Sequence, residues 1–108
     1  MANHRLIVFT NPKEGREQDF RDWYVNTHLA EVSNLDGLIP GQLYTLAPPV
    51  AEGGHRHMAV YELAEARLGE AQQALGGALK GGTLNMTDAF GPGQAALWWQ
   101  EEAPAVTR

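Results

Sequence analysis

The sequence predicts an α+β fold in which strands and helices follow one another in the order β-α-β-β-α-β. Two segments have helical spacing of their apolar residues, four short runs rich in β-formers surround them, and 108 residues suit one domain. In this order the strands form one antiparallel sheet with both helices on one face, the arrangement called ferredoxin-like. We expect residues 1–101 to form this single domain and residues 102–108 to be a loose C-terminal tail.

The first strand is expected over residues 4–10, a compact apolar run that ends at the turn signal Asn11-Pro12. Helical spacing begins at Arg16, and the helix should end between Ser33 and Asp36, before Gly37. One side of this helix carries Phe20, Trp23, Tyr24, Thr27 and Glu31. The acidic and basic residues lie mostly on its other sides, which predicts that the aromatic side faces the sheet.

A second strand is expected over residues 38–46, and it should begin with a bulge or bend at Pro40-Gly41. The glycine- and proline-rich stretch 47–54 is typical of an exposed connection. The third strand, residues 55–63, places His57, Ala59, Tyr61 and Leu63 on one face.

The second helix is expected over residues 65–80 and should fray early, because Gly69, Gly76 and Gly77 weaken it. The fourth strand is expected over residues 94–100. A regular strand would point Trp98 and Trp99 to opposite faces of the sheet.

Composition and charge exclude several classes of function. The formal net charge of −5 and the scattered basic residues argue against a nucleic-acid partner or an anionic membrane surface. The absence of cysteine excludes disulfides, a thiolate nucleophile and cysteine-based metal sites. The apolar run at residues 6–9 is too short for a signal peptide or a membrane span, so we expect a cytoplasmic protein. Ser33 is the only serine and has no nucleophile-elbow context, which argues against acyl-enzyme chemistry.

The predicted strands carry apolar residues on both faces, but the helices can cover only one face. Burial of the other face against a second copy of the chain would recover roughly 25 cal/mol per Å² of apolar area. We therefore expect a homodimer. The alternative is a monomer with an open sheet.

The segment from Asp19 to Glu31 is the strongest candidate for chemistry. His28 follows Tyr24 by one helical turn and Phe20 by two, so the three can share the edge that faces the sheet. An imidazole can act as an acid or base near neutral pH, and a tyrosine hydroxyl can orient or protonate a substrate oxygen. The alternative is a structural histidine that hydrogen-bonds a carbonyl at the helix end.

Four stretches resemble the dimeric α/β-barrel superfamily, and within it the EthD-like proteins. They are residues 6–12 (LIVFTNP), residues 15–17 (GRE), Trp23-Tyr24 followed by His28, and residues 57–62 (HMAVYE). The resemblance covers nearly the whole domain, although relatives often have proline where this chain has Ala30. It implies a barrel formed by two sheets, with a small-ligand cavity between sheet and helices in each subunit.

A more distant resemblance is to plant polyketide cyclases of the type that forms olivetolic acid. It rests on residues 24–26 (YVN) and on the positions of His4 and His57 near the starts of two strands. No histidine follows His57, so the C-terminal catalytic histidine of those cyclases has no counterpart here.

We therefore predict that His28, Tyr24 and His57 are catalytic. The predicted substrate-binding residues are His4, Phe20, Trp23, Ala59, Tyr61 and Trp98. His55 and His57 alternate on one strand and could be two metal ligands, but a third ligand has no recognisable spacing, so we predict neither a metal nor any other cofactor.

Three functions remain open at this point. The first is a cofactor-independent acid/base enzyme (a cyclase, isomerase or dehydratase) acting on a small, apolar, oxygenated substrate such as a polyketide-like, lactone or aromatic compound. The second is a non-catalytic protein that binds such a molecule. The third is a monooxygenase of the same superfamily, either cofactor-free or haem-dependent with His28 as the axial ligand.

Overall fold

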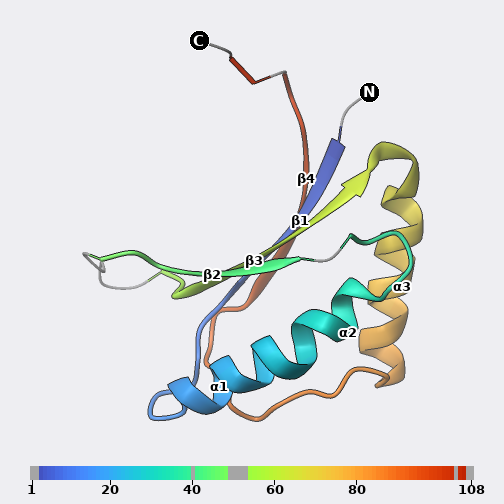
Figure 1. The fold of residues 1–108 in the computed structure, drawn as a ribbon. Coiled ribbons are helices and arrows are strands. Elements are labelled where there is room, and N and C mark those ends of the chain that lie inside the picture. Colours follow the sequence, from blue (N-terminus) through green and yellow to red (C-terminus); the bar gives the residue numbers. More distant parts are fainter. Residues whose placement is uncertain (1–2, 40, 49–53, 104, 107–108) are drawn as a thin grey trace.

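A computed structural model describes residues 3–39, 41–48, 54–103 and 105–106. The sheet is four-stranded and antiparallel, with the strand order β2-β3-β1-β4, and all helices lie on one of its faces (Figure 1). This order and layering confirm the predicted ferredoxin-like α+β fold. No helix of the described part is long and apolar enough to cross a membrane.

Strand β1 (Asn3–Thr10) lies in the middle of the sheet, between β3 (His57–Ala64) and β4 (Ala95–Gln100). Its Leu6 is aligned with Tyr61 on one side and with Trp98 on the other. Because side chains alternate along a strand, this register fixes which residues face the helices. Ala59, Tyr61 and Leu63 are buried there, as their alternation predicts.

Strand β2 (Gln42–Thr45) is shorter than the predicted strand 38–46, which is interrupted where the sequence indicated a bend. The backbone N–H of Ile39 still donates to the Glu62 carbonyl at 3.0 Å, so the chain runs along β3 before the interruption. At Gly41 a Cβ atom would lie 2.4 Å from the Tyr61 ring, and only glycine permits this approach. Residues 40 and 49–53, part of the predicted bend and of the predicted connection, lie outside the described residues.

The first helix has three consecutive parts: α1 (Glu17–Trp23), the π-helical turn η1 (Tyr24–His28) and α2 (Leu29–Ser33). Its ends agree with the prediction, but the π turn was not expected. In that turn the N–H of Leu29 donates to the carbonyl of Tyr24, five residues earlier. Such turns are rare and occur frequently at functional sites.

The second helix consists of a short 3₁₀ turn, η2 (Glu65–Arg67), followed by α3 (Leu68–Gly81). The predicted early fraying is wrong, because α3 continues through Gly76 and Gly77. Both glycines are exposed, whereas Leu75 and Ala78 bury the sheet-facing side of the same turns. The helix ends at Gly82, whose φ of 69° is the left-handed conformation typical of a helix C-terminus.

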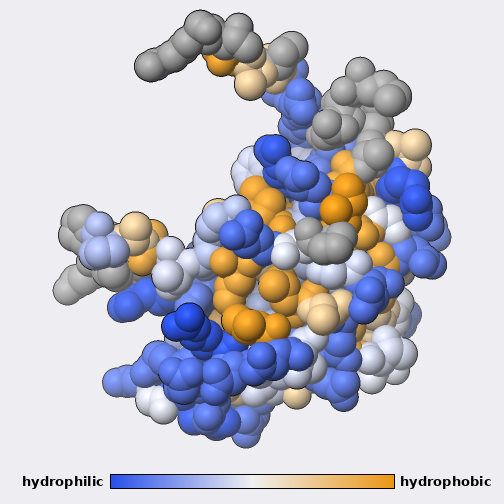
Figure 2. Space-filling model, in the orientation of Figure 1, coloured by the Kyte–Doolittle hydropathy of each residue, from blue (hydrophilic) through white to orange (hydrophobic). Residues whose placement is uncertain are grey.

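The two faces of the sheet differ in burial. Trp98 packs against the core on the helix side, whereas Trp99 is 51% exposed on the other face, so they point to opposite faces as predicted. Apolar surface is also visible in the middle of the molecule, beside the hydrophilic outer side of α1 (Figure 2). The uncovered face of the sheet carries exposed or half-buried apolar residues: Ile7, Phe9, Tyr44, Met58, Val60, Leu97 and Trp99.

Candidate functional site

A cavity of about 100 Å³ lies between the sheet and the helices. Its floor is formed by β1, β3 and β4, and its walls by the first helix, by α3 and by the segment that connects α3 to β4. Most lining side chains are apolar, and a few polar ones converge on the same space. The lining residues are Leu6, Val8, Thr10, Tyr24, His28, Val32, Tyr61, Leu75, Leu79, Met86, Phe90, Gln94 and Ala96.

The π turn determines how the aromatic residues of the first helix are arranged. In an α-helix, five residues advance about 140° beyond a full turn, so Trp23 and His28 would diverge. Here their rings stack with centroids 4.4 Å apart and an angle of 22° between planes. Tyr24 meets the same imidazole edge-on at 5.1 Å. The His28 ring is therefore held on two sides by aromatic contacts.

Several polar atoms at this cavity are buried without a hydrogen-bond partner among the described residues. They are Thr10 Oγ1, His28 Nδ1 and the Tyr61 hydroxyl. Buried polar atoms nearly always have partners, because leaving one unsatisfied costs about 1–3 kcal/mol. A polar ligand or ordered water in the cavity would satisfy them.

Burial sets the protonation states of these groups. It lowers the pKa of His28 to about 4, although the nearby Glu31 carboxylate partly opposes the shift. Burial raises the pKa of Tyr24 to about 12, with the neighbouring Tyr61 hydroxyl acting in the opposite direction. The pKa of Tyr61 is also raised, first by burial and then by Tyr24. At neutral pH the site therefore holds a neutral imidazole and protonated phenols.

The lowered pKa of His28 has a consequence for stability. The unfolded chain binds a proton on this residue below about pH 6.5, whereas the folded chain does so only below about pH 4. Lowering the pH through this window should destabilise the fold by about 2–3 kcal/mol through His28 alone. Urea unfolding at pH 7 and pH 4 checks this. A His28→Asn variant should lose that part of the pH dependence, whereas an unchanged dependence would contradict it.

Of the predicted site residues, His28, Tyr24 and Tyr61 line one cavity. Phe20 and Trp23 stand behind them in aromatic contact with Tyr24, at centroid distances of 5.5 Å and 5.4 Å. The remaining predicted substrate-binding residues do not line the cavity. Ala59 is buried in the core and Trp98 packs against it. His4 is also buried, and its Nε2 lies 3.3 Å from Gln100 Oε1.

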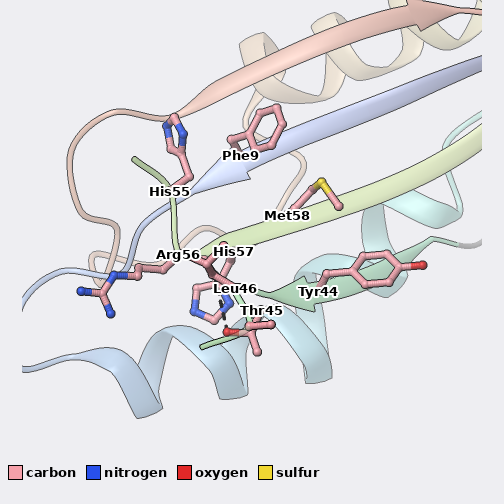
Figure 3. A pocket seen from close by; sticks show the side chains of 9 residues that line it. Phe9, Tyr44, Thr45, Leu46, His55, Arg56, His57 and Met58 are labelled. Carbon is pink, nitrogen blue, oxygen red and sulfur yellow. Dashed lines mark hydrogen bonds between the residues drawn. The ribbon is translucent and has the colours of Figure 1, made fainter. Parts of the chain in front are cut away.

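His57 does not line this cavity. On the helix side its ring packs against Phe20, which also contacts Tyr24, at 5.2 Å and 5.5 Å between ring centroids. His57 is also among the residues around a more open pocket of about 310 Å³, but its ring points toward the helices, whereas Phe9 and Met58 of the same pocket lie on the uncovered face of the sheet (Figure 3). Burial lowers the pKa of His57, with Arg21 and Arg56 contributing.

The His55 ring lies against Phe9 at 5.4 Å and contacts the Gly93 carbonyl through Nε2. In the part of the chain that the structure describes, no group of three or more His, Cys, Asp or Glu residues could hold a metal ion.

Sequence reasoning missed several residues of the cavity. Thr10 could have been found, because it alternates with Leu6 and Val8 on the helix-facing side of β1. Met86 and Phe90 lie in a segment without periodicity, and Gln94 directly precedes β4, so no local pattern indicated that they close the cavity.

The structure is that of a ferredoxin-like α+β protein with an apolar cavity between sheet and helices. No family model and no curated protein matches this sequence. Solved structures do match its fold. One is the haem degrader MhuD from Mycobacterium tuberculosis, solved with two haems bound in its active site. The structures of this chain and of MhuD match with a TM-score of 0.62 at 14% sequence identity, and the match covers 95% of this chain and 99% of the MhuD chain.

Two further structures have the same fold. An EthD family protein from Bacillus halodurans C-125 has a TM-score of 0.59 at 18% identity, over 94% of this chain and 99% of its own. A proposed monooxygenase from Shewanella loihica PV-4 has a TM-score of 0.56 at 15% identity, over 98% of this chain and 99% of its own. These similarities establish the fold.

Proposed function

We propose that the protein is a cofactor-independent acid/base enzyme and that the cavity between sheet and helices is its active site. The observation that carries this proposal is a buried, neutral imidazole with an unpartnered ring nitrogen, beside two phenols in an apolar cavity. Apolar walls with a few convergent polar groups and shifted pKa values are typical of small-molecule active sites.

In this proposal His28 is the general base. Its neutral ring accepts a proton from a carbon next to a substrate carbonyl, and the electron pair of the C–H bond moves onto the carbonyl oxygen. Tyr24 and Tyr61 are protonated and can donate hydrogen bonds to the enolate oxygen. Return of the proton to another carbon gives isomerisation, loss of a β-hydroxyl gives dehydration, and attack on a second carbonyl gives cyclisation.

The lining of the cavity also limits the substrate. None of its described lining residues is Lys, Arg, Asp or Glu, so an ionic group of the substrate would be buried without a counter-charge. We therefore infer a small, neutral, mostly apolar substrate with a carbonyl or phenol oxygen.

The direct test needs no knowledge of the product. A panel of small neutral ketones and 1,3-dicarbonyl compounds is incubated with the protein in D₂O, and deuterium uptake next to the carbonyl is followed by NMR. Protein-dependent uptake supports proton abstraction. Ligands that raise the melting temperature without exchange or consumption would favour the non-catalytic binding protein instead.

The fold shared with MhuD and the Shewanella protein favours a second candidate, a monooxygenase. In a cofactor-free version His28 would remove a proton from a quinol, and the resulting anion would react with O₂. The haem-dependent version fits poorly. The cavity of about 100 Å³ is below the 300–1,000 Å³ usual for drug-sized ligands. Oxygen uptake with a quinol, and a Soret band after haem addition, test the two versions.

We also propose that the uncovered sheet face is the interface of a homodimer. Leu97 and Tyr44 are each 44% exposed on this face, and Trp99 is 51% exposed. Contiguous apolar surface of this kind usually marks an interaction site. A twin subunit would bury it with the same patch on both copies.

A charge on that face should separate the subunits. The Leu97→Asp variant is expected to sediment as a monomer, because a buried, unpaired carboxylate opposes association. Val25 is a matched control, since it is equally apolar and 51% exposed but lies on the first helix, so Val25→Asp should remain dimeric. Sedimentation equilibrium checks both. A wild-type monomer would contradict the proposal.

A further inference from the structure

The cavity is closed on one side by the segment that connects α3 to β4. Met86, Phe90 and Gln94 of this segment line it, opposite Tyr24 and His28. At about 100 Å³ the cavity is smaller than the sites that usually hold small-molecule ligands, about 300–1,000 Å³. A substrate therefore needs one wall to move, and the question is which wall is free to do so.

The ends of the connecting segment are held by backbone contacts. At one end, the N–H of Thr83 donates to the Ala78 carbonyl at 3.1 Å. At the other end, the N–H of Lys13 donates to the Ala89 carbonyl, and the N–H of Gly91 donates to the Asn11 carbonyl at 2.7 Å. These contacts attach the ends to α3 and to the turn after β1.

The middle of the segment, residues 84–88, is held differently, and we call it the strap. Leu84 is buried, but the hydrogen bonds that tie the strap to the first helix involve side chains. The Glu31 carboxylate accepts the backbone N–H of Asn85 at 2.9 Å and its side-chain N–H at 2.7 Å. The Trp23 indole N–H donates to the Asn85 carbonyl. Asn85 thus joins the strap to Trp23 and Glu31 of this helix, and Asp88 adds an exposed ion pair to Arg16 at the start of the helix.

We propose that the strap is the movable wall of the active site and that Asn85 is its latch, which also positions His28 through Trp23. Breaking the Asn85 contacts would free Met86, which is 50% exposed and lines the cavity, without disturbing the backbone contacts at either end. This inference rests on the proposed role of the cavity as the binding site.

The positioning role follows from the aromatic contacts of Trp23. Its ring stacks on His28 at 4.4 Å and meets Phe90 edge-on at 5.0 Å, while its N–H holds Asn85. One side chain therefore contacts the proposed base, Asn85 of the strap and Phe90 just beyond the strap. When the strap opens, Trp23 loses its partner at Asn85, and the stacking on His28 loosens.

The Asn85→Ala variant tests the latch, with phenol as a small neutral probe. It removes one hydrogen bond to the Glu31 carboxylate, so the dissociation rate of phenol, measured by NMR line shape, should rise about 10- to 100-fold. The ring protons of His28 should also lose the ring-current shift that the stacked Trp23 imposes. Asn85 contacts Trp23 through its carbonyl, which the substitution keeps, so this second change would report movement of the strap.

Asp88→Asn is the matched control. It weakens the exposed ion pair between Asp88 and Arg16, at 3.0 Å, but leaves Asn85 and Glu31 intact. It should change neither signal. If phenol binds the wild type but Asn85→Ala changes neither the dissociation rate nor the His28 ring shift, the proposal that Asn85 is a latch is wrong. The proposed active site is not contradicted by that result. If phenol does not bind at all, the proposed site is in doubt, and the His28 ring shift alone decides the latch.

Discussion

The His28→Asn variant is expected to exchange substrate protons about 100- to 10,000-fold more slowly than the wild type, the usual contribution of a positioned general base. Asparagine has a similar size and polarity but cannot accept the proton. Burial holds the pKa of His28 at about 4, so the imidazole is neutral and can accept a proton at neutral pH, and the same shift makes it a weaker base than a free histidine. Deuterium uptake by a responsive ketone, followed by NMR, measures the loss.

The pH profile strengthens this test. Activity that depends on the neutral imidazole should be constant through the neutral range and fall as the pH drops below about 4, provided the fold survives. His57→Asn is the matched control, since His57 does not line the cavity and should not be needed for exchange. Equal rates in His28→Asn and wild type would remove the acid/base proposal.

The order of the elements could be predicted from the sequence because each has a local signal. Alternation along residues 57–63 assigned the faces of β3 correctly, and turn residues marked the ends of β1. The glycine at position 41 is needed for the close approach of the backbone to the Tyr61 ring. The range of the second helix was predicted as well, but its regularity was not, since propensity alone argued against Gly76 and Gly77. Tertiary packing of Leu75 and Ala78 overrides that local preference.

Part of the site could also be predicted, because it too has a local signal in the sequence. Tyr24 and His28 are four residues apart on one helix, and their proximity needs no knowledge of the tertiary structure. The π turn that stacks Trp23 on His28 has no sequence signature, and the strap has no periodicity. His57 was placed on the correct face of β3, but there it packs against a ring of the first helix and does not line the cavity.

That ring belongs to Phe20, and the Phe20→Ala variant is expected to lose about 3–5 kcal/mol of stability, the usual cost of removing a buried phenylalanine. Phe20 is fully buried and contacts the rings of Trp23, Tyr24, His57 and Phe90. A cavity in its place cannot be refilled easily, because its neighbours come from the first helix, from β3 and from the segment before β4. Urea unfolding followed by circular dichroism gives the change.

Phe20→Leu separates volume from aromatic contact. It keeps most of the buried apolar area, so it should cost clearly less than Phe20→Ala. A Phe20→Ala protein as stable as the wild type would mean that Phe20 does not anchor the first helix to the sheet, and the positions of Tyr24 and His28 would then need another explanation.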